Sequence, residues 1–174
     1  GLNHLYSGME TGSDQILKLI NKGFDADIVV RSGCMAKEAD MILSEFILLG
    51  IGGKELSEEN AAQTAKALNI IQPDFIRVHA TGIKLESKLG EFVRNGSFAL
   101  QSEEEIVVEQ KLFLQQLHEM DSYYVNEHIV NLLLEIRGNL RTEKQEMLST
   151  IDRFLTLPPD ERLLFAVGRR LNIF

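Results

Sequence analysis

One apolar segment followed by a glycine-rich turn constrains the fold most. Residues 41–49 are interrupted mainly by Ser44 and Glu45, and they end in the turn Gly50-Ile-Gly-Gly53. The run is too short to span a membrane, which takes about 20 residues, and it is typical of a parallel strand that is buried on both faces. Because parallel neighbours are joined by crossovers that usually contain a helix, the flanking segments should read as helices and further strands.

The first half of the chain has this alternating pattern. Ser13 can cap a helix whose apolar stripe includes Ile16 and Ile20, and Pro73 ends a later helix. The sequence predicts strands over 2–9, 41–49 and 74–80, and helices over 13–23, 25–39 (interrupted by Gly33) and 57–71. With right-handed crossovers, this order predicts an α/β fold, either an open doubly wound sheet or part of a barrel.

The second half reads as helices with one short strand. A charged, glycine-containing connection over 83–101 leads to Ser102-Glu-Glu-Glu105, a capping box that opens a helix. We therefore predict two parts, residues 1–101 with the strands and residues 102–174 as a helical extension. In the second part we expect helices over 102–120, 126–136, 142–157 and 161–170, an edge strand over 121–125 and a turn at 137–139.

Composition excludes several classes of function. The formal charge of −8 argues against a broad nucleic-acid surface. The single cysteine, Cys34, can form neither an intramolecular disulfide nor a metal cluster by itself, and a small apolar role on a helix suits it best. No apolar run suits a membrane span and no secretory signal pattern is present, so we expect no membrane partner and a cytoplasmic location.

The polar candidates lie where the predicted strands end. The segment 8–14 is a polar elbow from strand to helix, and parallel α/β folds bind ligands at such positions. Glu10 could accept hydrogen bonds from sugar hydroxyls, although spacing alone favours a simple strand–helix turn capped by Ser13 or Asp14. The glycines after residue 49 would let a ligand approach the backbone closely, but they form neither a P-loop nor a G-x-G-x-x-G motif.

The histidines give a weaker signal. Arg77 and His79 are two apart on one strand and so face the same side, where they either touch a ligand or pair with the chain. His128 shares a helical face with Asn131, which favours a capping or packing role, and His118 offers no motif. No H-E-x-x-H, C-x-x-C or G-x-S-x-G sequence is present, so the sequence predicts no metal site and no catalytic nucleophile.

Three of these segments resemble radical S-adenosylmethionine (radical SAM) proteins of the group that includes elongator-catalytic-subunit-like and methylthiotransferase-like members. Residues 8–14 (Gly-Met-Glu-Thr-Gly-Ser-Asp) are similar to the family's Gly-Leu-Glu-Ser-Gly-Ser-Asp element. Residues 46–53 are similar to its fifth strand and glycine turn, and residues 74–78 to its sixth strand. The resemblance implies strands four to six of a TIM-like (β/α)₆ barrel, followed by the helical extension.

The resemblance also implies an activity. In this family a 4Fe–4S cluster on three cysteines binds S-adenosylmethionine, and one-electron reduction yields a 5′-deoxyadenosyl radical that abstracts hydrogen from the substrate. By position, the resemblance implies a cofactor-binding set at the three strand ends. Its members are Glu10, Thr11 and Ser13 toward the ribose or methionine part, Leu48, Gly50 and Gly52 along the adenine, and Arg77 and His79 toward cofactor or substrate.

Two departures qualify the resemblance. The C-x-x-x-C-x-x-C cluster motif is absent, and Cys34 does not replace it. Residues 83–88 stand where the family has a Pro-x-Pro-Gly-Thr-Pro loop. We therefore expect the C-terminal part of a radical SAM oxidoreductase, with no catalytic residue, no tightly bound cofactor and no activity by itself, acting on an unknown substrate.

Two other readings stay open. The chain can be a complete, non-catalytic α/β module that binds a nucleotide at its glycine turns, or residues 102–174 can be a helical protein-interaction domain. An exposed barrel edge would also invite pairing between copies, so we expect a possible homodimer.

Overall fold

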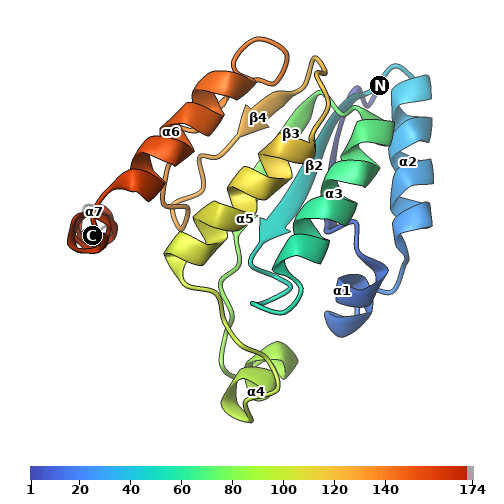
Figure 1. Ribbon diagram of the computed structural model, residues 1–174. Helices are drawn as coiled ribbons and strands as arrows, with labels where there is room; N and C mark the ends of the chain where they lie inside the picture. The colour runs from blue at the N-terminus through green and yellow to red at the C-terminus, as the bar shows by residue number, and fades with distance from the viewer. Residues whose placement is uncertain (172–174) are drawn as a thin grey trace.

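The computed structural model describes residues 1–171 and contains one five-stranded sheet in the order β1-β2-β3-β4-β5 (Figure 1). Strands β1 to β4 run parallel, and β5 is antiparallel to β4. The strands are β1 His4–Glu10, β2 Ile42–Leu49, β3 Phe75–Ala80, β4 Tyr123–Val125 and β5 Gly138–Asn139. The mixed α/β class is confirmed, whereas the sheet does not close into a barrel within residues 1–171 and has β1 and β5 at its edges.

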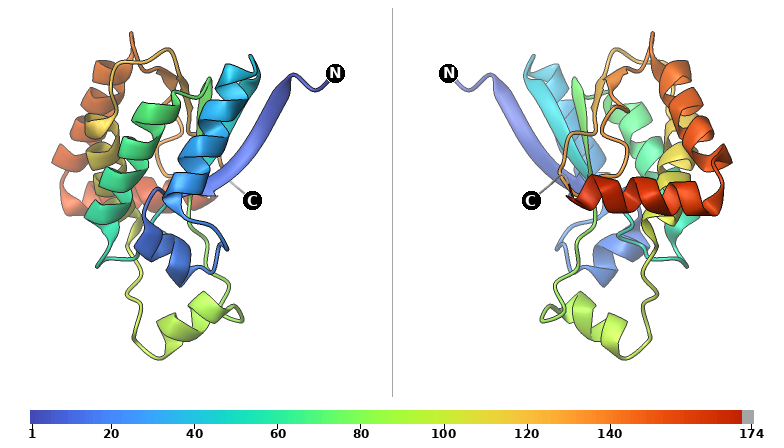
Figure 2. Two further views of the ribbon diagram at one scale, coloured as in Figure 1. Left: turned by 90° about the vertical axis from the view of Figure 1, so that its right-hand side faces the viewer. Right: turned by 90° about the vertical axis from the view of Figure 1, so that its left-hand side faces the viewer.

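The helices cover one face of this sheet. Helices α2, α3 and α5 lie side by side on it, α6 packs against α5, and α1 and α4 lie beyond the ends to which the strands point (Figures 1 and 2). Helix α7 runs from the helix-covered side past the β4–β5 side of the sheet. The helices are α1 Asp14–Leu19, α2 Ala26–Glu38, α3 Ser57–Ile71, α4 Lys88–Arg94, α5 Glu103–Gln116, α6 Lys144–Thr156 and α7 Pro159–Leu171.

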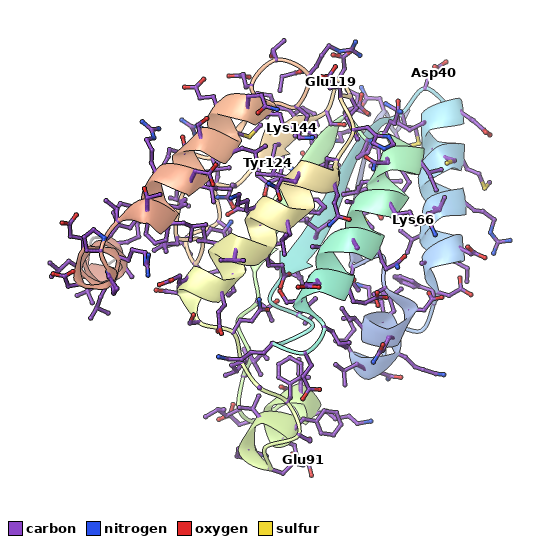
Figure 3. All side chains as sticks on the ribbon, in the orientation of Figure 1. Asp40, Lys66, Glu91, Glu119, Tyr124 and Lys144 are labelled. Carbon is purple, nitrogen blue, oxygen red and sulfur yellow. The ribbon has the colours of Figure 1, made fainter. Side chains whose placement is uncertain are left out.

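The core lies between the sheet and these helices. Alternate residues of β2 and β3 point into it, among them Leu43, Ile47 and Ile76, each almost fully buried. Tyr124 of β4 is also fully buried beside α5 and accepts a hydrogen bond from Gln110 Nε2 (3.0 Å; Figure 3). Burial raises the pKa of the Tyr124 hydroxyl, so this group stays neutral in the core.

Several predicted elements are confirmed, and glycine fits where helices touch. Ser13 caps α1, and the capping box from Ser102 to Glu105 is present at α5. Gly33 does not interrupt α2, because it lies where α2 meets α3 and an added Cβ would stand 2.8 Å from the Ile71 side chain. This glycine therefore allows the close approach of the two helices.

The prediction of a helix over 126–136 is wrong, because these residues form an irregular loop. Asn131 explains the difference: its Oδ1 accepts from the Ala80 amide (2.7 Å), and its Nδ2 donates to the Val78 carbonyl (2.7 Å). Asn126 Nδ2 donates to the Leu133 carbonyl (2.6 Å) in the same way. Asparagine side chains that bond the backbone compete with helix formation, so this loop extends the edge of β3 instead.

Four smaller expectations also differ from the structure. The connection 83–101 contains α4, which Ser87 caps through the Gly90 amide (3.0 Å). The turn at 137–139 includes β5, and β4 lies between β3 and β5 rather than at an edge. The apolar sequence of the strand at 42–49 predicts that helices cover both of its faces. In the structure helices cover one face, and residues 1–171 place no helix on the other.

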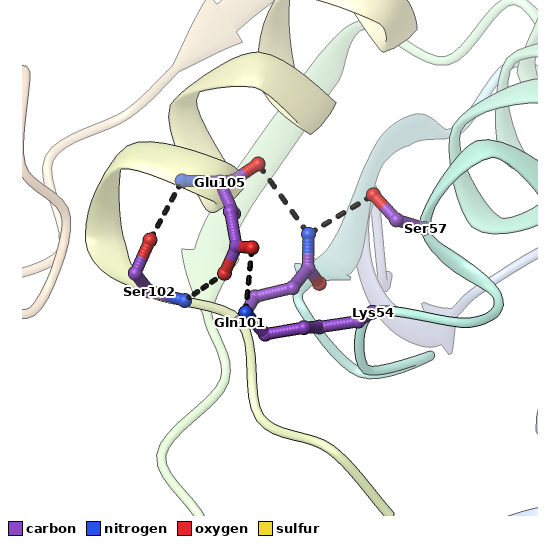
Figure 4. A network of polar contacts seen from close by, with 5 residues as sticks. All are labelled: Lys54, Ser57, Gln101, Ser102 and Glu105. Atoms are coloured by element: carbon purple, nitrogen blue, oxygen red, sulfur yellow. Dashed lines mark hydrogen bonds and ion pairs between the residues drawn. The ribbon is translucent and has the colours of Figure 1, made fainter.

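The sheet and the packing continue across residues 101 and 102. Gln101 Nε2 donates to Ser57 Oγ (2.9 Å), and Lys54 pairs with Glu105 (2.7 Å; Figure 4). The start of α5 is thereby attached to the turn after β2, and β4 extends the same sheet. The division into residues 1–101 and 102–174 stays a prediction.

Candidate functional site

The uncovered face of the sheet is lined by aromatic and basic side chains. Tyr6 lies beside Phe46, with 6.2 Å between ring centroids, and Phe75 lies 6.4 Å from Tyr123. His4 stacks on Tyr6 at 4.3 Å and bonds Ser44 Oγ through Nε2 (3.1 Å). Tyr6 remains 56% exposed, so these rings form an accessible surface and not a closed core. We call this surface the open face.

Arg77 lies at the centre of the open face. Its Cζ is 5.5 Å from the centroid of Tyr6, 5.6 Å from that of Phe75 and 6.0 Å from that of Phe46, which are cation–π distances. Its Nε is buried and has no hydrogen-bond partner among the described residues. The rings therefore contact the guanidinium without providing an acceptor for its Nε–H among residues 1–171.

His79 continues the open face toward the carboxyl end of β3. Its ring stacks on His128 at 4.1 Å and meets the edge of Phe46 at 5.3 Å. Burial lowers the pKa of His79 below its ordinary value; His128 and Arg77 lower it further, while Glu10 opposes them. His128 comes from the loop after β4, and its Nδ1 is buried without a partner in the described structure.

Glu10 is the third predicted residue that reaches this side. A bulge between Gly8 and Glu10 shifts the register of β1, and Glu10 adopts a left-handed backbone conformation (φ 63°). Its side chain folds back over Gly8 and accepts a hydrogen bond from Lys22 Nζ (2.7 Å). Such backbone conformations in residues other than glycine are unusual and are found often at functional sites.

The rest of the elbow is built into the fold. The Thr11 hydroxyl accepts from the Ser13 amide (3.0 Å), and Ser13 Oγ donates to Glu59 (3.1 Å) while it caps α1. Gly12 donates its amide to Thr64 (2.9 Å), and an added Cβ would lie 2.3 Å from the Gln63 carbonyl oxygen. Thr11 and Ser13 are buried with their hydroxyls in use, so the structure brings only Glu10 of this segment to the open face.

The glycine turn after β2 is held by a buried acid that the sequence analysis missed. Glu109 of α5 accepts from the Gly50 amide (3.0 Å), Asn60 Nδ2 (2.7 Å) and Ser57 Oγ (2.8 Å). Burial raises the pKa of Glu109, and these hydrogen bonds oppose that effect. Gly50 has φ +80°, a conformation that favours glycine. The backbone of this turn is therefore fixed by the protein itself.

Leu48 and Gly52 occupy different positions. Leu48 is half-buried on the open face beside His79 in the β-sheet register. At Gly52, an added Cβ would lie 2.8 Å from the Leu56 carbonyl oxygen, so the glycine is required by the tight turn. Of the predicted set, the structure thus brings Glu10, Leu48, Arg77 and His79 to one side of the sheet.

A second buried acid, Glu45, lies on the helix-covered face of β2. It is 1% exposed, and burial raises its pKa to about 7 against the hydrogen bonds of Ser7 and the Met9 backbone. Its Oε2 has no hydrogen-bond partner among the described residues. The sequence signal was present, since Glu45 is the one charged residue within an apolar strand.

The aromatic residues of the open face were missed for a simpler reason. The strand over 41–49 was predicted to be buried on both faces, and Phe75 was not singled out. Because Phe46 and Phe75 alternate with Ile47 and Ile76, they lie on the opposite face. Arg77 and His79 share the period of Phe75, and this shared period is the signal that could have identified the surface.

Metal ligands are not assembled in the part of the chain that the structure describes. No group of three or more His, Cys, Asp or Glu side chains in residues 1–171 could hold a metal ion. Cys34 lies on α2, in the layer of helices that covers the other face of the sheet. Within the same residues, none of the helices has the length and apolar character needed to cross a membrane.

Comparison with known proteins gives a likeness at the level of fold. No family model and no curated protein matches the chain. The structure is similar to that of an archaeal Elp3 from Methanocaldococcus infernus with an N-terminal deletion (1–46), with a TM-score of 0.58 and 18% sequence identity. The match covers 68% of this chain but only 28% of that chain, so the protein spans less than a third of its structural neighbour. A likeness at this identity shows the fold alone.

Proposed function

We propose that this chain is part of a radical SAM enzyme of the elongator-catalytic-subunit-like group and contributes strands four to six of its barrel. The observation that carries the proposal is the fold likeness to an Elp3, an elongator catalytic subunit of the radical SAM superfamily, together with the independent resemblance of three strand-end segments. The carboxyl ends of β1, β2 and β3 meet at one edge of the parallel sheet, which is where such folds bind ligands.

In this proposal, the strand ends bind the nucleoside part of S-adenosylmethionine. Glu10 offers a carboxylate to ribose hydroxyls, and the fixed turn at Gly50 presents backbone close to Leu48 and His79. Because Thr11 and Ser13 already use their hydroxyls and their backbone amides within the fold, this proposal gives them the role of holding the elbow in place beside Glu10. Arg77 and His79 would face the cofactor or the substrate.

The iron–sulfur cluster does not fit the described residues. Cys34 is a lone thiol on the helix layer, and the structure assembles no ligand set in residues 1–171. We therefore derive no redox step from this chain, and we expect it to lack S-adenosylmethionine cleavage when assayed alone. The cluster and its chemistry would have to come from other residues.

A nuclear magnetic resonance titration tests the proposal. The ¹⁵N-labelled chain is titrated with 5′-deoxyadenosine and with S-adenosylhomocysteine, and cytidine serves as the control nucleoside. We expect saturable shifts of amides at 10–12, 48–53 and 79–82, with millimolar affinity, corresponding to about 4 kcal/mol. Glu10→Gln should weaken binding several-fold, whereas Glu127→Gln, at an exposed carboxylate elsewhere, should not. Shifts confined to other surfaces, or equal shifts with cytidine, would contradict the proposal.

A second candidate function is protein association through the edge of the sheet. Strand β1 is an edge strand of the described sheet: it pairs with β2 on one side, no other strand of residues 1–171 pairs with its other side, and the Tyr6 ring is exposed there. This observation favours a homodimer or a non-catalytic interaction module. Light scattering across micromolar concentrations would detect a dimer, and a monomer throughout that range would count against pairing between copies.

A further inference from the structure

The open face has a charge opposite to that of the chain as a whole. The protein carries a formal charge of −8, yet the strand positions on this face contribute His4, Arg77 and His79, with His128 packed against them. Glu10 is the one acid that β1 to β4 place on this face, and it lies at the end of β1, paired with Lys22 (2.7 Å). A basic, aromatic surface on an acidic protein favours an anionic occupant.

Arg77 is the residue whose bonding is least complete. None of the ion pairs among the described residues involves Arg77, and its Nε is buried without a partner. The buried Nε–H of Arg77 favours an oxygen acceptor, because its desolvation is otherwise uncompensated. The surrounding rings satisfy the faces of the guanidinium by cation–π contact but cannot accept its in-plane hydrogen bonds.

We infer that Arg77 anchors an oxyanion-binding site on the open face, for a carboxylate or phosphate group attached to a flat or apolar body. The planar guanidinium matches the two oxygens of such a group, and Tyr6, Phe46 and Phe75 offer ring surface to the body of the ligand. The inference deepens the proposed function, in which Arg77 faces the cofactor or the substrate, by naming the chemical group that Arg77 would bind. Because Arg77 lies in the middle of β3, this binding can be measured without a nucleoside at the strand ends.

The stacked histidines make the site sensitive to pH. His79 follows Arg77 by two residues on the same face, about 7 Å along the strand, and stacks on His128 at 4.1 Å. The charged groups around the pair are Arg77 on β3 and Glu10 at the end of β1, the latter neutralised by Lys22. Protonation of His79 adds positive charge to the open face, so oxyanion affinity should rise as pH falls.

The test measures the Arg77 side chain directly. In the ¹⁵N-labelled full chain, the Arg77 Nε–H signal is followed while sodium sulfate or sodium benzoate replaces sodium chloride at constant ionic strength. We expect a saturable shift of this signal, with half-saturation at or below about 10 mM. A signal that follows ionic strength alone, with chloride as effective as the two oxyanions, would overturn the inference.

Matched variants separate the site from general charge effects. Arg77→Gln should lower the affinity by about 10-fold or more, since a charge-assisted pair is lost. Arg77→Lys, which keeps the charge but not the planar fork, should lie between Gln and the wild type. Arg31→Gln removes the same charge from the exposed surface of α2 and should leave the affinity unchanged. Equal binding by wild type and Arg77→Gln, both shown folded by their spectra, would overturn the inference.

The two anions and the pH series identify the ligand chemistry. Preference for benzoate would indicate a carboxylate on an aromatic body, and preference for sulfate would indicate a phosphate-type group.

The pH series tests the contribution of histidine. Sulfate keeps its charge across the titration range of histidine, so a several-fold rise in its affinity from about pH 8 to about pH 5.5 would show that imidazole protonation strengthens binding. His79→Asn removes the imidazole that follows Arg77 on the same face and should reduce that rise, and a flat response in the wild type would remove the histidines from the site. Loss of nucleoside binding with intact sulfate binding would count against the proposed function alone.

Discussion

The two faces of the sheet carry different chemistry on the same strands. On the helix-covered face, β2 and β3 contribute Leu43, Ile47 and Ile76, which pack against α2 and α3. On the open face the same strands contribute Phe46, Phe75 and Arg77, which contact one another and remain accessible to a ligand. The side-chain period of two residues thus separates residues that stabilise the fold from residues that can recognise a partner.

The buried acids sharpen this difference. Both Glu45 and Glu109 lie within the packed side of the molecule, whereas the centre of the open face has none. Glu109 has three hydrogen-bond donors around it, while one oxygen of Glu45 has no partner among the described residues. A carboxyl group therefore stabilises the packed side only where donors satisfy it.

Adjacent residues of β3 give the largest expected contrast in stability. Ile76→Ala removes a fully buried side chain and should lower the free energy of unfolding by about 2–5 kcal/mol. Phe75→Ala, one residue earlier on the open face, should cost about 1 kcal/mol, since its ring is only half-buried on an accessible surface. Urea denaturation of both variants measures the difference, and equal losses would show that the open face is part of the core.

The Glu109 network should give the next largest effect. Glu109→Ala leaves the Gly50 amide and the Asn60 and Ser57 donors without their acceptor, which should cost about 3 kcal/mol. Hydrogen exchange at Gly50 should accelerate with it, because the turn loses its anchor. Glu105→Ala, an exposed acid one turn earlier on α5, serves as the control and should cost about 1 kcal/mol through its capping box. Equal losses for the two variants would remove the special role of Glu109.

The sequence predicted the parts of this molecule that depend on local pattern. The strands around Phe46 and Arg77, the caps at Ser13 and Ser102 and most helices follow from periodicity and capping chemistry. The loop over 126–136 did not, because Asn131 bonds the backbone of β3, a contact distant in sequence. Which face of the sheet stays uncovered depends on where the helices pack. The apolar run over 41–49 therefore predicted burial on both faces, although Phe46 lies on the open face.

The candidate site was predictable to a similar extent. Arg77 and His79 share one face by their spacing alone, and Glu10 lies at a strand end as expected. Thr11 and Ser13 entered the predicted set by their position in the family resemblance, yet their hydroxyls bond the chain itself. Which hydroxyls are already in use depends on α3, more than 40 residues away along the chain, and so is not written in the local motif.

The isolated acid of the covered face predicts an unusual dependence of stability on pH. The pKa of Glu45 is raised from 4.5 to about 7 by burial, so the folded state binds more protons than the unfolded state between these values. The free energy of unfolding should therefore fall as pH rises through this window, by about 1–3 kcal/mol. Glu45→Gln should reduce this fall and stabilise the protein above about pH 7, where the wild type carries a buried charge.

Chemical denaturation at a series of pH values measures this effect. Glu109→Gln provides the comparison, because the pKa of Glu109 is raised in the same direction but its carboxylate is well bonded. If the free energy of unfolding changes with pH equally in the wild type and in Glu45→Gln, then Glu45 Oε2 is hydrated. The two faces of the sheet would then not differ as described.

The smallest expected effect belongs to the open face and is measured as a pKa shift. The pKa of His79 lies below its ordinary value because of burial, with smaller contributions in the same direction from His128 and Arg77. Replacing the stacked partner by His128→Asn should raise the pKa of His79, because it removes a like charge and exposes the ring. Glu10→Gln should lower the same pKa, since Glu10 favours the protonated imidazole. Nuclear magnetic resonance titration of the ring signals in the three proteins gives both shifts.

The lowered pKa of His79 also affects stability. In the folded state His79 binds fewer protons than in the unfolded state near and below the ordinary pKa of histidine. His79 should therefore reduce the free energy of unfolding slightly as pH falls through that region. Opposite shifts in the two variants would place His79 in the electrostatic field of the open face, whereas no response to either would show an imidazole governed by solvent.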